Sequence, residues 1–162
     1  MKDLSTKRKI VVSVIIILIA LTVGFIWGNS IMSKEASSEE SEAVSSTLQT
    51  VVDAVFGEDV VVVSHEGIRK AAHFIEFFIL GTEFCVLYIL IKREGKRGYL
   101  EIMPFGLAVA AIDETIQIFS ERGSSIIDVM IDYSGYLFAV VLFVAVFVIR
   151  RAVKGRKREK TD

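Results

Sequence analysis

Long runs of apolar residues, separated by short charged segments, dominate the pattern along the chain. The first run, IVVSVIIILIALTVGFIWG, covers residues 10–28. At about 1.5 Å per helical residue, it is close in length to the roughly 30 Å hydrocarbon core of a bilayer. Three further runs cover residues 68–91, 100–119 and 126–149. Pro104, the only proline, is expected in the first turns of the third helix, where a missing N–H costs little. The pattern predicts an all-α, polytopic membrane protein with four transmembrane helices.

The segment between the first two runs, residues 29–67, has a different pattern. Ser37 and Glu40 have the spacing of a capping box, and apolar residues then recur at helical spacing as far as Phe56. This predicts an amphipathic helix from about residue 38 to residue 56. Because the segment is acidic, it gains nothing from anionic lipid, and we expect its helix to dock on the end of the bundle.

The composition agrees with a membrane protein. Hydrophobic residues make up 52% of the 162 residues, and the mean hydropathy is +0.54. Since the apolar residues are clustered in long runs, the class of soluble globular proteins is excluded. The length suits one domain, residues 1–162. The first run follows a basic start, as in a signal peptide, but it is long and lacks a nearby small-residue cleavage site, so we expect an uncleaved first helix.

The net charge of −1 hides a strong segregation of charge by sign. Fifteen of the 19 basic residues fall in three segments, 1–9, 92–98 and 150–162. Because basic segments remain in the cytoplasm, we expect both termini and the basic tail to be cytoplasmic. Segments 29–67 and 120–125 are then extracellular, and so is the amphipathic helix. A role in topology near anionic lipid explains the basic tail better than binding to nucleic acid does.

Ionisable residues interrupt the last three apolar runs at similar predicted depths. Counted from the outer ends of their helices, His73 lies about 7 Å deep and Glu76 about 12 Å deep. Asp113 and Glu114 on the third helix, and Asp132 on the fourth, lie about 8 to 9 Å deep. A charge at such depth costs about 2.5 kcal/mol or more unless it is paired or hydrated. We therefore expect these side chains to face one another in a polar pocket that opens to the outside. Its predicted members are Arg69, Lys70, His73, Glu76, Asp113, Glu114, Gln117, Arg122, Asp128 and Asp132.

Helical spacing also predicts which neighbours these side chains face. Asp113 and Gln117 share one face of their helix, while Glu114 points about 100° away. The two adjacent carboxylates can therefore address two different neighbouring helices. Ser124 or Ser125 is expected to cap the fourth helix.

The charge balance of the predicted pocket leaves several interpretations open. Three cations face five carboxylates, so some carboxylates are protonated, or His73 is charged, or a cation is bound. The pocket is then a structural ion-pair network, a functional cleft or a metal site. His73 and Glu76 place two ligands on one helix face, but His65 is the only other histidine. No complete ligand set is apparent, and we predict neither a metal nor a cofactor.

Three blocks of sequence share a pattern of polar residues with a known family. They are SKEASSEESEAVS at 33–45, RKAAHFIEFFILG at 69–81 and DETIQIFSERGSSIIDVMIDYSGYLFA at 113–139. Together they resemble the VanZ-like family of bacterial membrane proteins, which is named for a teicoplanin-resistance protein. The third block is the most specific, and the first is weak alone. By this resemblance, the family's signature positions are Lys70, His73, Asp113, Glu114, Gln117, Arg122, Asp128, Asp132 and Gly135.

The resemblance implies an integral protein of the bacterial cell membrane that is linked to resistance to glycopeptides, chiefly teicoplanin. It does not imply a particular reaction. Phe77 stands where a tyrosine is common in the family, which puts any role of that hydroxyl in doubt. Asp132 stands where asparagine is frequent, which changes the charge of the pocket.

Three functions are compatible with the predicted pocket. In the favoured one, the pocket binds a lipid-linked cell-wall precursor, and Arg69, Lys70 and Arg122 meet its phosphate. The second is an enzyme with His73 as general base, although no known catalytic signature is present. The third is a small proton-coupled carrier, in which Glu83 leads towards the cytoplasm. Membrane lipids are the other expected partners, and the oligomeric state stays open.

Overall fold

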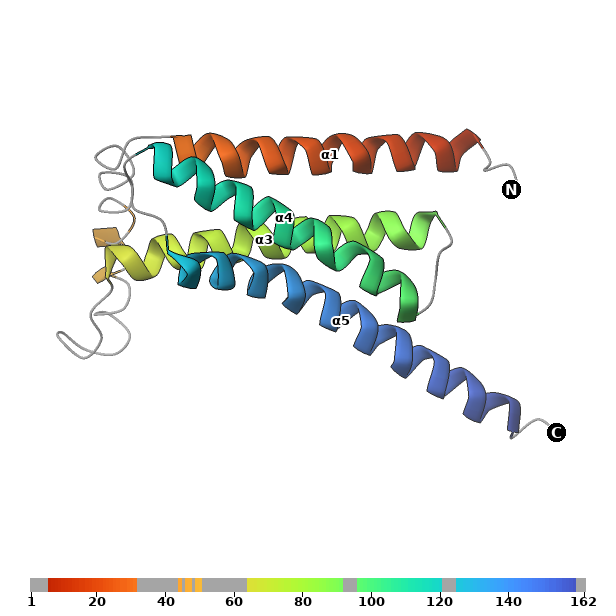
Figure 1. Ribbon diagram of the computed structural model, residues 1–162. Coiled ribbons are helices and arrows are strands. Elements are labelled where there is room, and N and C mark those ends of the chain that lie inside the picture. The colour runs from red at the N-terminus through yellow and green to blue at the C-terminus, as the bar shows by residue number, and fades with distance from the viewer. Residues whose placement is uncertain are drawn as a thin grey trace.

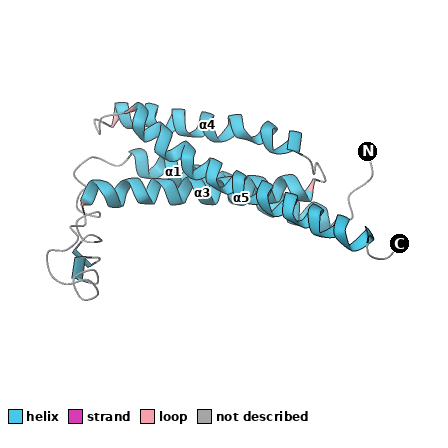
Figure 2. Cartoon of the chain, turned by 90° about the horizontal axis from the view of Figure 1, so that it is seen from below, coloured by secondary structure: helices cyan, strands magenta, loops and turns pink. Residues whose placement is uncertain are grey.

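Four long helices form most of the chain in the computed structural model (Figure 1). The structure describes residues 6–31, 44, 46, 47, 49, 50, 64–91, 96–120 and 125–159. The helices are α1 (Thr6–Ile31), α3 (His65–Leu90), α4 (Lys96–Phe119) and α5 (Ile126–Glu159). Each is long and apolar enough to cross a membrane, and the described residues include no strand (Figure 2). The prediction of an all-α protein with four transmembrane helices is confirmed.

Each predicted apolar run lies almost entirely within one helix, but the helices extend beyond the runs. α1 begins at Thr6, α4 begins at Lys96, and α5 continues to Glu159 through most of the basic tail. Lys and Arg are good helix formers, so the basic flanks continue the helices. The expected position of Pro104 is therefore wrong, because α4 starts early enough to place this residue in the helix interior. There its ring removes one helical hydrogen bond, to the carbonyl of Leu100.

Little of the predicted amphipathic helix, residues 38–56, falls within the part of the chain that the structure describes. Five residues between Val44 and Thr50 are described, and all five are helical. Thr50 Oγ1 donates a hydrogen bond to the carbonyl of Ser46 at 2.9 Å. The remainder of this segment lies outside the described residues, and its docking on the bundle stays a prediction.

α3 packs against α1, α4 and α5. Its closest approach is to α5, where glycine is required. A Cβ atom at Gly135 would lie 2.2 Å from the carbonyl oxygen of Phe74, and one at Gly81 would lie 2.7 Å from that of Tyr136. Small residues allow helix backbones to pack this closely inside membranes. The crossing holds His73, the neighbour of Phe74, against α5.

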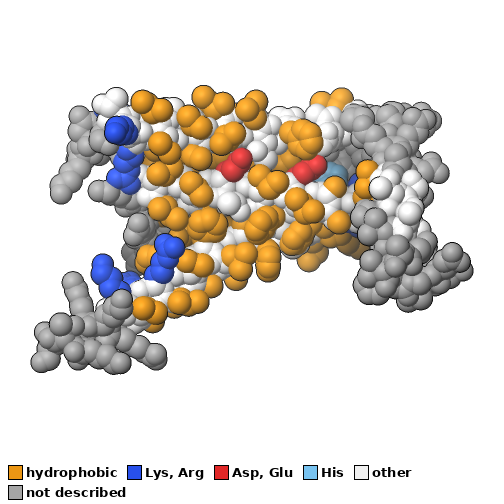
Figure 3. Space-filling model, turned by 180° about the vertical axis from the view of Figure 1, so that it is seen from behind, with side chains coloured by type: hydrophobic (Ala, Val, Ile, Leu, Met, Phe, Trp, Pro, Cys, Tyr) orange, Lys and Arg blue, Asp and Glu red, His pale blue; other side chains and the backbone are white. Residues whose placement is uncertain are grey.

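Apolar side chains fill the interior of the bundle and also cover its flanks. Phe77, Leu80, Cys85 and Tyr136 are fully buried, and the Tyr136 hydroxyl donates a hydrogen bond to the carbonyl of Ile102 at 2.8 Å. Large hydrophobic side chains are exposed on all four helices. Figure 3 shows this hydrophobic flank, which acidic side chains interrupt. Such a surface suits contact with hydrocarbon rather than with water.

The two ends of the bundle carry different groups. At one end, called the polar end below, α1 and α4 finish where α3 and α5 begin (Figure 1). At the other end, called the basic end, α1 begins and α5 finishes, and the described cations there include Arg8, Arg150, Arg151 and Lys154. Arg8 Nε donates a hydrogen bond to the carbonyl of Leu90 at 2.5 Å, which joins the start of α1 to the end of α3.

Candidate functional site

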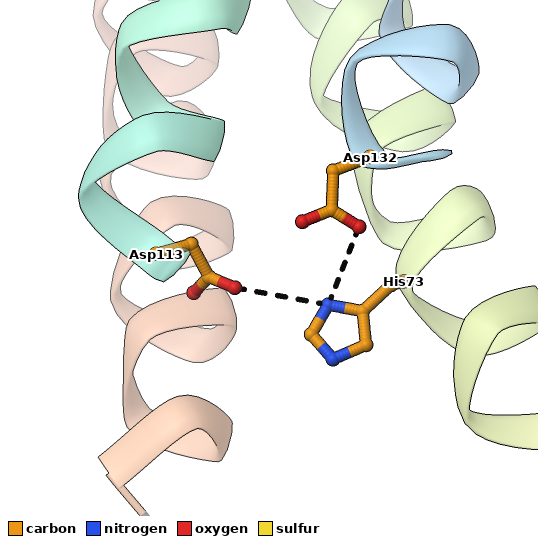
Figure 4. A group of neighbouring side chains, drawn as sticks. All are labelled: His73, Asp113 and Asp132. Carbon is orange, nitrogen blue, oxygen red and sulfur yellow. Dashed lines mark ion pairs between the residues drawn. The ribbon is translucent and has the colours of Figure 1, made fainter. Parts of the chain in front are cut away.

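Three helices bring His73, Asp113 and Asp132 together near the polar end (Figure 4). His73 Nδ1 lies 3.8 Å from Asp113 Oδ2 and 3.6 Å from Asp132 Oδ1. Asp113 is 0% exposed and Asp132 is 2% exposed, while the His73 side chain is 12% exposed. These residues, called the His–Asp–Asp cluster below, come from α3, α4 and α5, as the matching depths predict. Their arrangement suits binding of a proton or a cation between the two carboxylates.

Hydrogen bonds fix the carboxylate of Asp113. Ser30 Oγ at the end of α1 donates to Asp113 Oδ1 at 2.7 Å, and Gln117 Nε2 donates to Asp113 Oδ2 at 2.9 Å. Gln117 lies one helical turn after Asp113 on the same face. Ser30 and Gln117 are themselves buried. The Asp113 carboxylate is thus held in one orientation by donors from two helices.

Glu114 points to a different neighbour, as its helical offset from Asp113 predicts. Its Oε2 accepts a hydrogen bond from the backbone N–H of Ser125 at 3.1 Å, immediately before α5. The Ser125 hydroxyl in turn accepts from the N–H of Ile127 at 3.1 Å. Ser125 therefore caps α5, and Ser124, the other expected cap, lies outside the described residues. The adjacent carboxylates of α4 hold two different parts of the bundle in place.

Cations lie between the His–Asp–Asp cluster and the surface of the polar end. Lys70 Nζ lies 2.5 Å from Glu66 Oε1 and 4.0 Å from Asp128 Oδ1. The ion pairs among the described residues do not include Arg69. Both cations line a small cavity of about 10 Å³, together with Ile131 and five more of the predicted pocket residues. A cavity of this volume accommodates about one water-sized group. These five residues are His73, Glu114, Gln117, Asp128 and Asp132.

One predicted member that the structure describes, Glu76, neither lines this cavity nor belongs to the cluster. Glu76 Oε1 accepts a hydrogen bond from Asn29 Nδ2 of α1 at 3.1 Å. Glu76 is three residues from His73 and therefore lies on the same side of α3, and α1 supplies its polar partner Asn29. Arg122 lies outside the described residues. The binding role of the whole set stays a prediction.

The sequence interpretation missed the contribution of α1. Ser30 supports Asp113 and Asn29 binds Glu76, whereas the first helix was expected to end at residue 28. Thr22 Oγ1 also donates to Glu83 Oε1 at 3.0 Å. The signal was present, because Asn29 and Ser30 follow the first apolar run directly at the predicted outer end. Hydropathy assigned them to the loop because they are polar.

Comparison with known proteins identifies the family of the chain. No curated protein matches it, and no solved structure matches it. The sequence model of the VanZ/LLP1 family matches residues 14–149, a range that includes all the described residues of the site. The match covers well over half of the sequence and agrees with the resemblance of the three sequence blocks. The chain belongs to the VanZ/LLP1 family.

Proposed function

We propose that this VanZ/LLP1-family protein lies in the bacterial cell membrane with its polar end outside and both termini in the cytoplasm. The sign of the charges supports this orientation. The described cations Arg8, Arg150, Arg151 and Lys154 lie at the opposite end from the site, and basic flanks stay in the cytoplasm. The cavity beside the His–Asp–Asp cluster then opens towards the external headgroup layer.

We propose further that the polar end binds a phosphate of a lipid-linked cell-wall precursor. The observation that carries this proposal is the position of Arg69 and Lys70 on the cavity of about 10 Å³ near the membrane surface. Guanidinium groups bind phosphate oxygens in a bidentate manner, and ammonium groups bind them as point charges. Arg69 is outside the ion pairs among the described residues. One phosphate oxygen fills the cavity, and the remainder of the headgroup lies at its mouth.

The carboxylates around these cations have two roles in the proposal. Glu66 and Asp128 hold the Lys70 ammonium between them, with Nζ–O distances of 2.5 and 4.0 Å. Asp128 is partly exposed and is therefore also available to an amine of the precursor. Arg122, at a signature position by the resemblance, is a third cation proposed for the phosphate. Binding of this kind shields the precursor from capture by a glycopeptide such as teicoplanin.

A direct binding measurement tests the proposal. Purified protein in nanodiscs is titrated with a fluorescent polyprenyl-pyrophosphate-linked wall precursor. Hydrogen bonds to charged groups contribute about 1.5–3 kcal/mol, so Arg69→Gln is expected to weaken binding about tenfold or more. Arg151→Gln makes the same change at the basic end and is expected to leave the affinity unchanged. Equal affinity of wild type and Arg69→Gln would remove the proposal.

A cellular measurement tests the implied role in resistance. Cells that express the wild-type chain are expected to survive higher teicoplanin concentrations than cells that express Asp113→Asn or Arg122→Ala. Matched membrane levels of the three proteins are established by immunoblotting. If all three chains leave susceptibility at the level of the empty vector, this member has no role in teicoplanin resistance.

A small proton-coupled carrier is a second candidate, favoured by the polar contacts between α1 and α3. Glu76 and Glu83 lie two turns apart on one face of α3, and each accepts a hydrogen bond from α1. The rise between them is about 10 Å, so water must link them for a proton to pass. Proton flux into liposomes that is lost in Glu83→Gln would support this function, and absence of flux in the wild type would exclude it.

A further inference from the structure

We propose that the His–Asp–Asp cluster is a binding site for one divalent transition-metal ion, of which Zn²⁺ is the best-fitting example. The three residues offer one imidazole nitrogen and two carboxylate oxygens, and these atoms lie within 4.8 Å of one another. All three point towards a common centre from α3, α4 and α5 (Figure 4). The sequence interpretation considered only His73 with Glu76 on one helix, and the complete set exists only across helices.

The distances favour a bridging ion over direct ion pairs. His73 Nδ1 lies 3.8 and 3.6 Å from the two carboxylate oxygens, beyond the usual 2.7–3.2 Å hydrogen-bond range. Zinc binds imidazole nitrogen and carboxylate oxygen at about 2.0–2.2 Å, so its neighbouring tetrahedral ligands lie about 3.4 Å apart. The two separations seen here exceed that value by a few tenths of an ångström. Since the three ligand atoms lie within 4.8 Å of one another, side-chain movements towards the centre are required to complete the geometry.

Two independent observations point to a ligand at this place. Asp132 is 2% exposed, and its Oδ2 is buried without a hydrogen-bond partner among the described residues. A buried carboxylate oxygen in that state carries a large desolvation cost unless a cation compensates it. In addition, His73 and Asp132 line the cavity of about 10 Å³, so an ion that they hold has space beside it for one water or one phosphate oxygen as a further ligand.

Charge and donor type limit the kind of ion. A divalent ion cancels the two carboxylate charges with a neutral His73, which suits a site within the membrane span. Imidazole with carboxylates suits Zn²⁺, Fe²⁺ or Mn²⁺, whereas Mg²⁺ and Ca²⁺ prefer oxygen ligands alone. Three protein ligands leave a fourth position for water or for a ligand oxygen, as in open zinc sites.

The surroundings of Asp113 resemble the outer shell of a metal site. Ser30 and Gln117 donate hydrogen bonds of 2.7 and 2.9 Å to its two oxygens. Such bonds orient ligating carboxylates, and their loss typically weakens metal binding by about 10–100-fold. Ser30 and Gln117 are thus positioning residues in the proposed site.

Metal titration of the purified full-length chain in detergent micelles tests the inference. After removal of metals by chelator and dialysis, we expect the wild type to bind one Zn²⁺ per chain, measured by elemental analysis and by calorimetry. An excess of Mg²⁺ should not displace it. Asp132→Asn keeps the side-chain shape and is expected to weaken Zn²⁺ binding by more than about 100-fold, and Ser30→Ala by about 10–100-fold. Helical circular dichroism checks that both variants are folded.

Glu83→Gln is the matched control, because it neutralises another carboxylate within the membrane that contacts Thr22 rather than the cluster. It is expected to bind Zn²⁺ as the wild type does. The inference fails if the wild type binds no Zn²⁺. It also fails if Asp132→Asn and the wild type bind Zn²⁺ equally, because equal binding would indicate an adventitious site elsewhere on the protein.

A bound cation would also explain how an acid-rich pocket accepts a phosphate, and only this consequence rests on the proposed function. The Zn²⁺ titration contains no precursor, so a negative result leaves phosphate binding by Arg69 untouched. Conversely, failure of precursor binding leaves the metal site to be judged by its own titration.

Discussion

The polar and basic ends of the bundle differ in how far their ionisable side chains are buried. At the polar end, Asp113 and Asp132 are 0% and 2% exposed and face His73. At the basic end, Arg150 and Arg151 are exposed. There α5 diverges from the other helices (Figure 1), and a groove of about 720 Å³ has aromatic walls that include Tyr99 and Phe147. Exposed cations beside an apolar groove suit the headgroup layer, whereas buried charges that face one another from three helices are typical of a functional site.

The comparison teaches that the number of charged residues does not distinguish a topology signal from a site. The basic tail has more charged residues per length of sequence than the polar end, yet the cations described there are exposed on the surface of the protein. At the polar end, Asp113, Glu114 and Asp132 are buried, because α3, α4 and α5 meet there, with glycines at the crossing of α3 and α5. Burial and mutual orientation are therefore the properties that the following changes are designed to disturb.

The largest expected effect is in cysteine labelling from outside the cell, where we expect one end of the bundle to be labelled and the other not at all. In a Cys85→Ala background, one cysteine is placed at Phe119→Cys, which is 83% exposed at the end of α4. Another is placed at Lys154→Cys, which is exposed near the end of α5. An impermeant maleimide added to intact cells is expected to label the first site only, because basic flanks stay inside. Labelling at Lys154→Cys alone would invert the proposed orientation.

The next largest effect is expected from Gly135→Ala. The added Cβ would lie 2.2 Å from the carbonyl oxygen of Phe74, a backbone atom that cannot move without separating α3 from α5. Overpacking of this kind typically costs about 1–3 kcal/mol, and we expect the upper part of that range. Unfolding in mixed micelles measures the change.

Gly24→Ala is the matched control for this helix crossing, since a Cβ at Gly24 meets nothing within 4 Å. Its unfolding free energy is expected to stay within about 0.5 kcal/mol of the wild type. If Gly135→Ala were equally harmless, close packing of α3 on α5 would not be what positions His73.

Asp113→Asn should have an intermediate effect. The new amide places a donor where Asp113 now accepts hydrogen bonds from Ser30 and Gln117. An unsatisfied buried polar group costs about 1–3 kcal/mol, so we expect a loss of about 2 kcal/mol in unfolding free energy. Arg150→Gln, a neutralisation at the basic end, should change it by less than about 0.5 kcal/mol. Equal effects at both ends would contradict the distinction between them.

The smallest effect is expected from Thr22→Val, which removes the hydrogen bond to Glu83. Hydrogen bonds between helices in membranes average about 0.6 kcal/mol, and we expect a loss of that size. Thr115→Val is the control, because the Thr115 hydroxyl bonds to the carbonyl of Ala111 in its own helix. Identical losses in the two variants would mean that the contact between α1 and α3 adds nothing specific.

Much of the fold was predictable because it depends on local properties. Hydropathy over some 20 residues determines which segments can cross a membrane, and all four predicted runs are helical. Matching depth also predicted that His73, Asp113 and Asp132 would meet, since buried charges at one level need one another. The offset of Glu114 from Asp113 followed from helical periodicity alone.

The remainder depends on how each helix is rotated and packed, which the sequence pattern does not specify. Glu76 shares one side of α3 with His73 as predicted, but its hydrogen bond from Asn29 of α1 was not expected. Ser30 supports Asp113 from a helix that hydropathy treated only as an anchor. The depth of Pro104 in α4 was misjudged because basic residues extended the helix beyond its apolar run. For Glu76 and Ser30 the difference from the prediction comes from a contact between helices, and for Pro104 it comes from the basic flank outside the apolar run.

A double-mutant cycle between His73→Gln and Asp132→Asn tests the central claim most directly, that the cluster acts as one unit. Unfolding free energies of the wild type, both single variants and the double variant are measured in the same micelles. Residues in contact within one network couple by about 0.5–3 kcal/mol, and we predict at least about 1 kcal/mol here. The same cycle with Glu83→Gln in place of Asp132→Asn should show no coupling. Additive effects of His73→Gln and Asp132→Asn, within about 0.5 kcal/mol, would contradict the account.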